Sequence, residues 1–273
     1  METSGDFAER DEARISQLAS FVDGAVRPWF RAEVRGLDRI PPGAALYVGN
    51  HNAGLMMPEA LLLGAAAYQA HGLHAVPFGL AGDAVVSLPV LRDLTVPLGA
   101  VRATPENARR LLARGAKVLV YPGGDLEAMR PFRDRDRIVF GGRRGYIRAA
   151  LRAGAPVVPV VTAGAHATCV VLTDGQWLAK LLRADRLLRV KVWPITLCLP
   201  WGLVVGPGLV FLPWPSRVLQ EVLEPIRFER DGEEAAADED YVRACAERVE
   251  STMQRALTRL ADERRAMKEE RRA

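Results

Sequence analysis

Apolar positions along the chain fall into two recurring patterns, short continuous runs and longer stretches with helical spacing. The runs ALYVGN (residues 45–50), AKVLVYPGG (116–124) and APVVPVVTAG (155–164) end at polar or glycine turns and predict buried strands. Between them, apolar residues recur at three- and four-residue intervals, which predicts amphipathic helices. Strand and helix therefore alternate, which predicts an α/β fold with a largely parallel sheet flanked by helices.

Two of the helices between these strands have clear start and stop signals. Thr104 is suited to cap the first helix, with Pro105 in its first turn and Gly115 at its end. The stretch GRRGYIRAALRAG predicts the second helix, and Gly154 is its stop signal. Each helix leads directly into one of the predicted strands.

The two ends of the chain carry the longest helical patterns. The N-terminal amphipathic helix, predicted within residues 1–31, has one apolar face formed by Ile15, Leu18, Val22, Val26 and Trp29. This face can pack on the protein's own core, or it can lie on a membrane surface. Residues 229–273 are predicted to form a C-terminal helical extension, a long charged helix from residue 240 whose end frays in solvent.

Composition narrows the class of protein. A chain of 273 residues with 49% hydrophobic and 26% charged residues can bury a large single core. Three cysteines at unrelated spacings suggest neither a disulfide framework nor a metal site, which favours a reducing compartment such as the cytoplasm. The charged first residues lack the apolar run of a secretory signal peptide.

The most apolar segment is PITLCLPWGLVVGPGLVFLPWP, residues 194–215. It is long enough to span a bilayer, but its five prolines and three glycines would break a membrane helix. We therefore predict a buried or interfacial loop and strand, with Trp201 and Trp214 suited to the headgroup region of a membrane. A purely structural role in the core is the alternative.

The positive charge of the chain is unevenly distributed. Net charge is +4, and residues 130–148 hold seven arginines against two aspartates. Such a patch attracts the phosphates of a cofactor, a lipid headgroup or a nucleic acid, or it is simply a solvated face. We do not expect nucleic-acid binding, because no interleaved aromatic residues or recognisable binding module accompany the arginines.

Candidate chemistry gathers at the predicted strand ends, where α/β proteins bind ligands. His51 in GNHNAG could accept a proton from a hydroxyl, Arg102 could hold a phosphate, and Gly123 and Gly124 could turn backbone amides inward. This combination suits transfer of a group from a phosphate-bearing donor to an alcohol. The alternative is an ordinary structural histidine; His71, His74 and His166 are interpreted as structural or surface residues.

Four segments in order resemble the glycerolipid acyltransferase family of lysophosphatidate and lysophospholipid acyltransferases: VRGLDRIPPGAALYVGNH, PLGAVRATPE, VLVYPGGD and GAPVVPVV. The resemblance covers residues 32–228, which we take as the acyltransferase domain. The long stretch from YPGGD to GAPVVPVV resembles a bacterial branch related to diacylglycerol and phytyl-ester acyltransferases.

The resemblance implies roles for the matching positions. His51 would be the general base, activating the acceptor hydroxyl for attack on the thioester of acyl-CoA or acyl carrier protein. Arg102 would contact the acceptor phosphate or headgroup. No metal or tightly bound cofactor is implied. The other expected substrate-binding residues are Asn50, Gly54, Pro122, Gly123, Gly124 and Asp125.

Two departures from the family pattern affect the site. The family places an aspartate five positions after the histidine, where this chain has Met56, and a glutamate where this chain has Gly123. Glu59 could serve as the acid only if residues 52–57 form a loop and Pro58 starts a helix, because eight residues of unbroken helix rise about 12 Å. Asp83 and Asp125 are the other candidates.

The sequence therefore predicts a peripheral O-acyltransferase at the cytoplasmic face of the membrane. Its acceptor would be a glycerolipid or another lipid alcohol, and a neutral alcohol is as compatible with the sequence as lysophosphatidate. The alternative is a non-catalytic protein that kept the fold and binds lipid or acyl-CoA. An enzyme would depend steeply on His51, whereas a binding protein would not.

Overall fold

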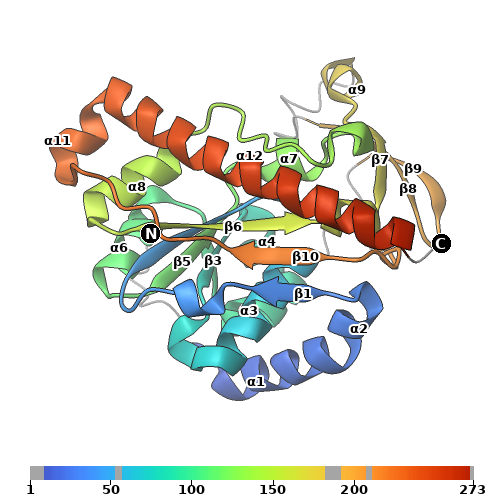
Figure 1. Cartoon of the computed structure of the whole chain (residues 1–273), viewed down its shortest axis with the longest axis horizontal. Coiled ribbons are helices and arrows are strands. Elements are labelled where there is room, and N and C mark those ends of the chain that lie inside the picture. The colour runs from blue at the N-terminus through green and yellow to red at the C-terminus, as the bar shows by residue number, and fades with distance from the viewer. Residues whose placement is uncertain (1–8, 53–56, 182–191, 207–210, 271–273) are drawn as a thin grey trace.

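A seven-stranded sheet forms the centre of the protein (Figure 1). The computed structural model describes residues 9–52, 57–181, 192–206 and 211–270. The strand order is β1-β10-β6-β2-β5-β3-β4; β1 and β10 run opposite to the other five, which are parallel. The strands are β1 Glu33–Arg35, β2 Ala45–Gly49, β3 Phe78–Ala81, β4 Ala100–Arg102, β5 Lys117–Val120, β6 Val157–Ala163 and β10 Leu219–Val222. The predicted α/β fold with a largely parallel sheet is confirmed.

Strand β2 lies between β5 and β6 and is buried on both faces. Leu46 and Val48 join the core cluster beneath the C-terminal helices, whereas Ala45 and Tyr47 pack against Leu63 on the opposite face. This two-sided burial explains why the strand reads as a continuous apolar run rather than an alternating one. Its carboxyl end therefore projects from the middle of the sheet.

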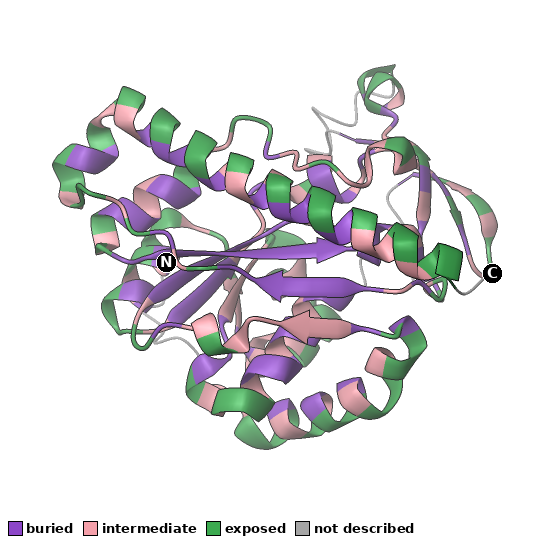
Figure 2. Cartoon of the chain, viewed as in Figure 1, coloured by how far each residue is buried: buried purple, intermediate pink, exposed green. Residues whose placement is uncertain are grey.

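Helices cover both faces of the sheet, with their buried sides turned inward (Figures 1 and 2). On one face lie α1 and α3; on the other lie α6, α8, α11 and α12. Thr104 caps α6 by accepting from the Asn107 main-chain N–H, and Gly154 ends α8 in the left-handed conformation, as predicted. The helices on these faces are α1 Glu12–Phe21, α3 Pro58–His71, α6 Pro105–Ala113, α8 Gly145–Ala153, α11 Gly232–Ala237 and α12 Glu239–Glu270.

The predicted N-terminal helix is present and contains a π-helical turn at Val22–Val26, which leads into α2, Arg27–Phe30. Its apolar face packs on α3 through Ala19, Val22 and Phe30. Packing on the protein's own core, one of the two predicted uses of this face, therefore occurs.

The C-terminal helix α12 packs on β6 through an apolar stripe that includes Val249, Met253 and Leu257. The helix continues to Glu270, the last described residue. Arg264 donates to the main-chain oxygen of Arg217 at 2.6 Å, and Glu263 bonds to Arg35 at 2.7 Å. These contacts tie the last turns of the helix to the outer strands.

A second sheet contains β7 Val170–Thr173, β8 Ile195–Cys198 and β9 Gly202–Val205, all antiparallel. The apolar segment 194–215 thus contributes the β8–β9 hairpin. On the inner side of this sheet Val171, Cys198 and Phe211 are buried together, whereas Leu197 and Leu203 on the outer side are 40% and 62% exposed. Within the residues that the structure covers, no helix is both long enough and apolar enough to cross a membrane.

Candidate active site

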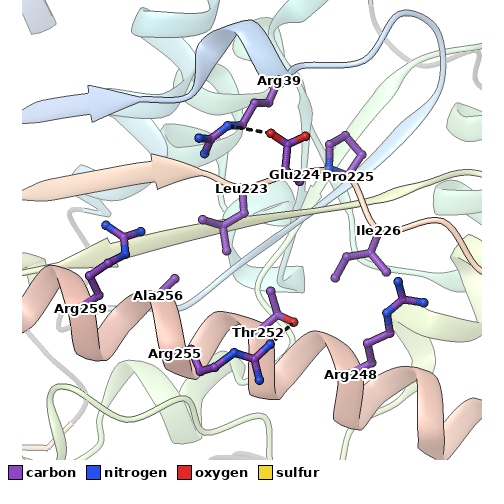
Figure 3. Close-up of a pocket in the computed structure, with 10 residues that line it drawn as sticks. All are labelled: Arg39, Leu223, Glu224, Pro225, Ile226, Arg248, Thr252, Arg255, Ala256 and Arg259. Atoms are coloured by element: carbon purple, nitrogen blue, oxygen red, sulfur yellow. Dashed lines mark hydrogen bonds and ion pairs between the residues drawn. The ribbon is translucent and has the colours of Figure 1, made fainter.

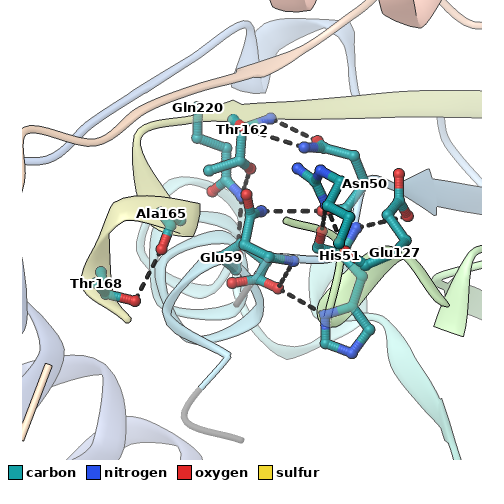
Figure 4. Close-up of polar contacts among 10 residues, drawn as sticks. Asn50, His51, Glu59, Glu127, Thr162, Ala165, Thr168 and Gln220 are labelled. Atoms are coloured by element: carbon teal, nitrogen blue, oxygen red, sulfur yellow. Dashed lines mark hydrogen bonds and ion pairs between the residues drawn. The ribbon is translucent and has the colours of Figure 1, made fainter. Parts of the chain in front are cut away.

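His51 and Glu59 form a hydrogen-bonded pair at the carboxyl end of β2 (Figure 4). The distance from His51 Nδ1 to Glu59 Oε1 is 3.1 Å. The Glu59 side chain is 1% exposed and that of His51 is 15% exposed. A carboxylate accepts hydrogen bonds, so Nδ1 is the donor in this pair, and the second ring nitrogen points away from the network in Figure 4.

The turn into α3 brings Glu59 back to the histidine. Met57 has a φ of 41°, a left-handed conformation that reverses the chain direction, and α3 begins at Pro58. The helix start at Pro58 is one of the conditions that the sequence set for Glu59 to reach His51. The Asn52 main-chain N–H donates to the same carboxylate oxygen at 3.1 Å, and Gln220 Nε2 donates to the Glu59 main-chain oxygen at 2.8 Å. Gly54 and Met56 lie outside the described residues.

The two other candidate acids bond elsewhere. Asp83 pairs with Arg102 at 3.0 Å, and Asp125 pairs with Arg143 at 2.9 Å. Of the three acids that the sequence offered, Glu59 is the one that contacts the imidazole in the described structure.

Two buried residues that the sequence analysis missed hold the main chain of His51. Glu127 Oε2 accepts from the His51 main-chain N–H at 2.9 Å, and Arg130 Nη1 donates to the His51 carbonyl oxygen at 2.5 Å. The same Arg130 nitrogen also bonds to the Glu127 main-chain oxygen, at 2.7 Å. Glu127 is 0% exposed and Arg130 is 3% exposed. Together they fix the peptide on both sides of the histidine.

Burial shifts the ionisation of both residues. Desolvation raises the pKa of Glu127 to about 7, although the Arg130 charge and the N–H groups of His51 and Val139 oppose this rise. Desolvation also lowers the pKa of Arg130, and the Glu127 charge opposes that change. The charge of each side chain therefore stabilises the ionised form of the other inside the protein.

The glycine turn after β5 makes room for this arrangement. A Cβ atom on Gly123 would lie 2.3 Å from Cβ of Glu127, which is sterically impossible without movement. Helix α7, Gly124–Ala128, then carries Glu127 under the histidine. The Gly124 N–H donates to the Tyr121 carbonyl oxygen at 3.1 Å, so it is used within the turn rather than turned toward a ligand. A larger residue at position 123 would therefore collide with Glu127.

Arg143 ties together the remaining residues of this turn. Its Nη1 donates to the carbonyl oxygens of Pro122 at 3.2 Å and Gly123 at 2.8 Å, while Nη2 bonds to Asp125. The Tyr121 ring lies 5.0 Å from the His51 ring, centroid to centroid. The turn therefore forms one wall beside the imidazole.

Asn50 has a structural use. Its Nδ2 donates to the Thr162 carbonyl oxygen at 3.0 Å, and its Oδ1 accepts from the Thr162 N–H at 2.8 Å. Both ends of the amide are thus bonded to β6, and the residue is 1% exposed. Asn50 therefore locks the end of β2 to its neighbour rather than facing a substrate.

Arg102 lies at the same edge of the sheet as His51 but at some distance from it. It ends β4, which is three strand spacings from β2, or about 14 Å. Its side chain is half exposed, with Nη1 bonded to Asp83 and Nη2 bonded to Ser87. A ligand that contacts both Arg102 and His51 must therefore extend across the strand ends.

The arginine-rich stretch 130–148 is only partly an open cationic patch: Arg133 and Arg137 are exposed, but other arginines of the stretch are not. Arg130 is buried in the site, Arg143 bonds to the glycine turn, and Arg148 bonds to Glu239. The expected phosphate attraction by this stretch is therefore reduced, because the fold uses several of these charges internally.

A separate open groove of about 550 Å³ lies between α12 and the segment after β10 (Figure 3). Leu223 and Ile226 line it, together with arginines such as Arg248 and Arg255. Ile226 pairs with Val157 at the start of β6, whereas His51 follows the end of the parallel strand β2. The groove therefore lies at the opposite edge of the sheet and is not part of this site.

Comparison with known proteins identifies relatives across most of the chain. Residues 31–163 match the family model described as Acyltransferase. An uncharacterized protein of Mycobacterium tuberculosis is 36% identical over 241 residues, which cover 88% of this chain and 64% of that protein. The DGAT1/2-independent enzyme synthesizing storage lipids of Gallus gallus is 31% identical over 150 residues, covering 53% of this chain and 42% of that enzyme. The chain thus spans slightly less than two thirds of its mycobacterial relative.

A solved structure shares the fold. The crystal structure of the 1-acyl-sn-glycerophosphate (LPA) acyltransferase PlsC from Thermotoga maritima matches with a TM-score of 0.56 at 19% identity, covering 93% of this chain and 84% of that chain. The strand-end histidine, the matched domain and this fold agree with one another. Residues 31–163 form a domain of the Acyltransferase family, and the chain shares its fold with a lysophosphatidate acyltransferase.

Proposed function

We propose that this protein is an O-acyltransferase that moves a fatty acyl group from a thioester donor to the hydroxyl of a lipid alcohol. The observation that carries the proposal is the His51–Glu59 hydrogen bond of 3.1 Å at the end of the central strand. A buried carboxylate that accepts from Nδ1 stabilises the imidazolium formed when Nε2 takes a proton. The family membership supports acyl transfer as the reaction class.

The proposed reaction needs only groups of this chain and the two substrates. His51 Nε2 takes the proton of the acceptor hydroxyl as the hydroxyl oxygen bonds to the thioester carbonyl carbon. The tetrahedral intermediate then collapses, the carbon–sulfur bond breaks, and His51 returns the proton to the leaving thiolate. Glu59 stays ionised throughout and orients the ring. Acyl-CoA and acyl carrier protein are both donors of the required thioester.

The main-chain contacts of Glu127 and Arg130 support this role. In the proposed reaction the imidazole must keep its position while it gains and loses a proton. Hydrogen bonds to both the N–H and the carbonyl of His51 hold the backbone from which the ring projects. Misplacement of a catalytic group by about 1 Å can cost a hundredfold in rate.

An apolar cavity of about 190 Å³ under α3 is proposed to receive the acyl chain. It lies between α1 and α3 and is lined by Ala60 and Leu61, which directly follow Glu59, and by Gly64 one turn further along. A Cβ atom on Gly64 would meet nothing within 4 Å, so a larger side chain there would fill empty space. We expect Gly64→Leu to shorten the longest acyl chain accepted, measured by competition between acyl donors of different lengths.

We propose a neutral lipid alcohol, such as diacylglycerol or a long-chain alcohol, as the preferred acceptor. Gly123 stands where relatives of the lysophosphatidate type have a glutamate, and Arg102 is already bonded to Asp83. The name of the Gallus gallus relative, an enzyme synthesizing storage lipids, agrees with a neutral product. The reaction would take place at the cytoplasmic face of the membrane, to which the protein binds peripherally, because both substrates are amphiphiles.

The decisive experiment is acyl transfer from labelled long-chain acyl-CoA and acyl carrier protein to a panel of lipid acceptors. Wild-type protein is compared with His51→Ala and Glu59→Gln, and His74→Ala serves as the matched control because His74 is exposed and remote from the site. We expect losses of about 10²- to 10⁴-fold in kcat for the two site variants and no change in the control.

The alternative, a non-catalytic lipid-binding protein, predicts a different result. In that case no variant changes acyl transfer, because wild-type protein forms no product, while acyl-CoA or liposome binding is equal in all four proteins. Circular dichroism of each variant separates loss of catalysis from loss of fold.

A further inference from the structure

The helix pair α4–α5, comprising Asp83–Ser87 and Pro89–Thr95, leaves its large apolar side chains in solvent. Val90 is 81% exposed, and three leucines of the same short segment are also exposed: Leu88 53%, Leu91 39% and Leu94 63%. Among the described residues, no member of this helix pair belongs to a buried apolar cluster. Four such side chains within seven residues form an exposed apolar surface, and exposure of apolar surface to water is energetically unfavourable.

Polar contacts fix the base of the helix pair to the rest of the molecule. Arg102 of β4 bonds to Asp83 and Ser87, both in α4. On the other side, Arg14 of α1 donates to the Asp93 carbonyl oxygen at 3.2 Å. The helix pair is therefore held by its polar groups, and its apolar side chains are left to face outward.

The position of the helix pair relates it to the candidate site. It follows β3 directly, so α4 begins at the carboxyl edge of the sheet, the edge where His51 also lies. The second exposed apolar surface of the protein, the outer face of the small sheet, follows the carboxyl end of β6 on the other side of β2. Two exposed apolar surfaces thus flank the strand ends that carry His51.

We propose that the α4–α5 pair is a membrane-inserted element that seats the active-site edge on the bilayer, with Leu88, Val90 and Leu94 among the lipid chains. This inference rests on the proposed function, because it assigns the partner from which the lipid acceptor reaches the site. A bilayer fits both exposed apolar surfaces because its continuous apolar interior can cover the two at once. Tryptophan side chains favour the membrane interface, and two of them are exposed here, Trp201 at 56% and Trp29 at 44%.

The arrangement also sets a route for the acceptor. Arg102 ends β4, the outermost strand in the order β4-β3-β5-β2, and bonds to the helix pair through Asp83 and Ser87. A lipid that leaves the bilayer beside α4–α5 would cross the ends of β3 and β5 before its hydroxyl reaches the imidazole on β2. The exposed bond between Arg102 and Asp83 can be exchanged for the headgroup of a bilayer phospholipid beside the helix pair.

The first test measures insertion without using catalysis. Val90→Cys, labelled with the environment-sensitive fluorophore NBD, is mixed with vesicles of phosphatidylcholine and phosphatidylglycerol. The three native cysteines are buried and therefore react slowly. Ala113→Cys at the opposite edge of the sheet is the matched control, since Ala113 is exposed at the end of α6. We expect a blue shift and a severalfold rise in fluorescence at position 90 and no change at position 113.

Two outcomes of this test overturn the proposal. An unchanged spectrum at position 90 means that the helix pair does not enter the bilayer, and an equal change at both positions means that vesicle contact is unspecific. The same label on a His51→Ala background should insert equally well, so a failure of the catalytic proposal does not affect this readout.

The second test asks whether insertion serves catalysis. The double variant Leu88→Asp and Leu94→Asp is compared with Ala113→Asp, which adds charge at the opposite edge. We expect the double variant to lose about tenfold or more in vesicle flotation and in activity on vesicle-embedded acceptor, with less than a twofold loss on detergent-dispersed acceptor. Equal activity of both variants on vesicles overturns the proposal, as does formation of a stable oligomer by wild-type protein that the double variant disrupts.

Discussion

Two acid–arginine pairs lie at the same edge of the sheet and differ in burial. Glu127 and Arg130 are almost completely buried, and both bond to the main chain of His51. The side chains of Asp83 and Arg102 are 77% and 50% exposed, and they bond to each other. Water screens the exposed pair, whereas the buried pair cannot lose one member without leaving an uncompensated charge. The first pair therefore holds the histidine in place, and the second is able to change partners.

Removal of Arg130 should produce the largest effect on stability. Arg130→Ala deletes the bonds to His51 and Glu127 and leaves the Glu127 carboxylate buried without its neighbouring cation. We expect a loss of about 3–5 kcal/mol in the free energy of unfolding, measured with urea. Arg133→Ala is the matched control, because that side chain is 84% exposed. A loss below about 1 kcal/mol for Arg130→Ala would show that the buried pair is no more important for stability than the exposed pair.

The ionisation of Glu127 should make stability depend on pH. Burial raises the pKa of Glu127 to about 7 in the folded protein, above the ordinary value of 4.5. The folded state therefore holds this proton more tightly, so the contribution of Glu127 to stability is fully present below pH 4.5 and is lost as the pH rises through 7. The difference between the two pKa values corresponds to a loss of about 3 kcal/mol in the free energy of unfolding.

The measurement is urea unfolding of wild-type protein and Glu127→Gln between pH 4 and pH 8. Glutamine does not titrate, so the stability of wild-type protein relative to the variant should decrease as the pH rises. A difference that stays constant over this range, or that increases, would contradict the raised pKa.

An intermediate effect is expected from the glycine that makes room for Glu127. Gly123→Ala places a methyl group 2.3 Å from Glu127 Cβ, which must move and thereby disturb the His51 main chain. We expect a loss of about 1–3 kcal/mol in stability together with reduced kcat. Gly145→Ala is the control, because a Cβ atom there meets nothing within 4 Å. Equal effects of the two substitutions would show that the contact with Glu127 is unimportant.

The smallest stability effect is expected at the exposed pair. Arg102→Ala should change the free energy of unfolding by less than about 1 kcal/mol. If Arg102 contacts a headgroup, its loss should raise the KM for phosphate-bearing acceptors more than for diacylglycerol, with kcat little changed. A matched Asp83→Asn variant frees the arginine and should lower that KM. Identical KM values for both acceptor classes in all three proteins would leave Arg102 without a role in acceptor binding.

Local patterns were sufficient to predict much of the fold. Continuous apolar runs identified β2, β5 and β6, and the signals at Thr104 and Gly154 marked the ends of two helices. Short strands such as β1 and β4, each of three residues, were missed because so few positions show no period. The insertion of β10 between β1 and β6 involves residues nearly two hundred positions apart, which no local pattern encodes.

The candidate site shows the same division. A histidine at the end of an apolar run, followed by glycine, was enough to select His51. Glu127 and Arg130 were missed, although their presence in an otherwise apolar helical turn, EAMR, directly after the glycine turn, is a signal that could have identified them. Arg130 was instead assigned to a surface patch, because charge counts take no account of burial.

The sequence by itself determined the alternation of strand and helix, the ends of several helices and the position of a histidine at a strand end. These features depend on side-chain periodicity and on capping by residues within one or two turns. Only the tertiary structure decided that Glu59, rather than Asp83 or Asp125, contacts His51. It also decided that Glu127 and Arg130 form hydrogen bonds with the main chain of His51. Those contacts depend on the direction of the chain after a turn and on which charged side chains the packed sheet buries. Both are properties of the whole fold.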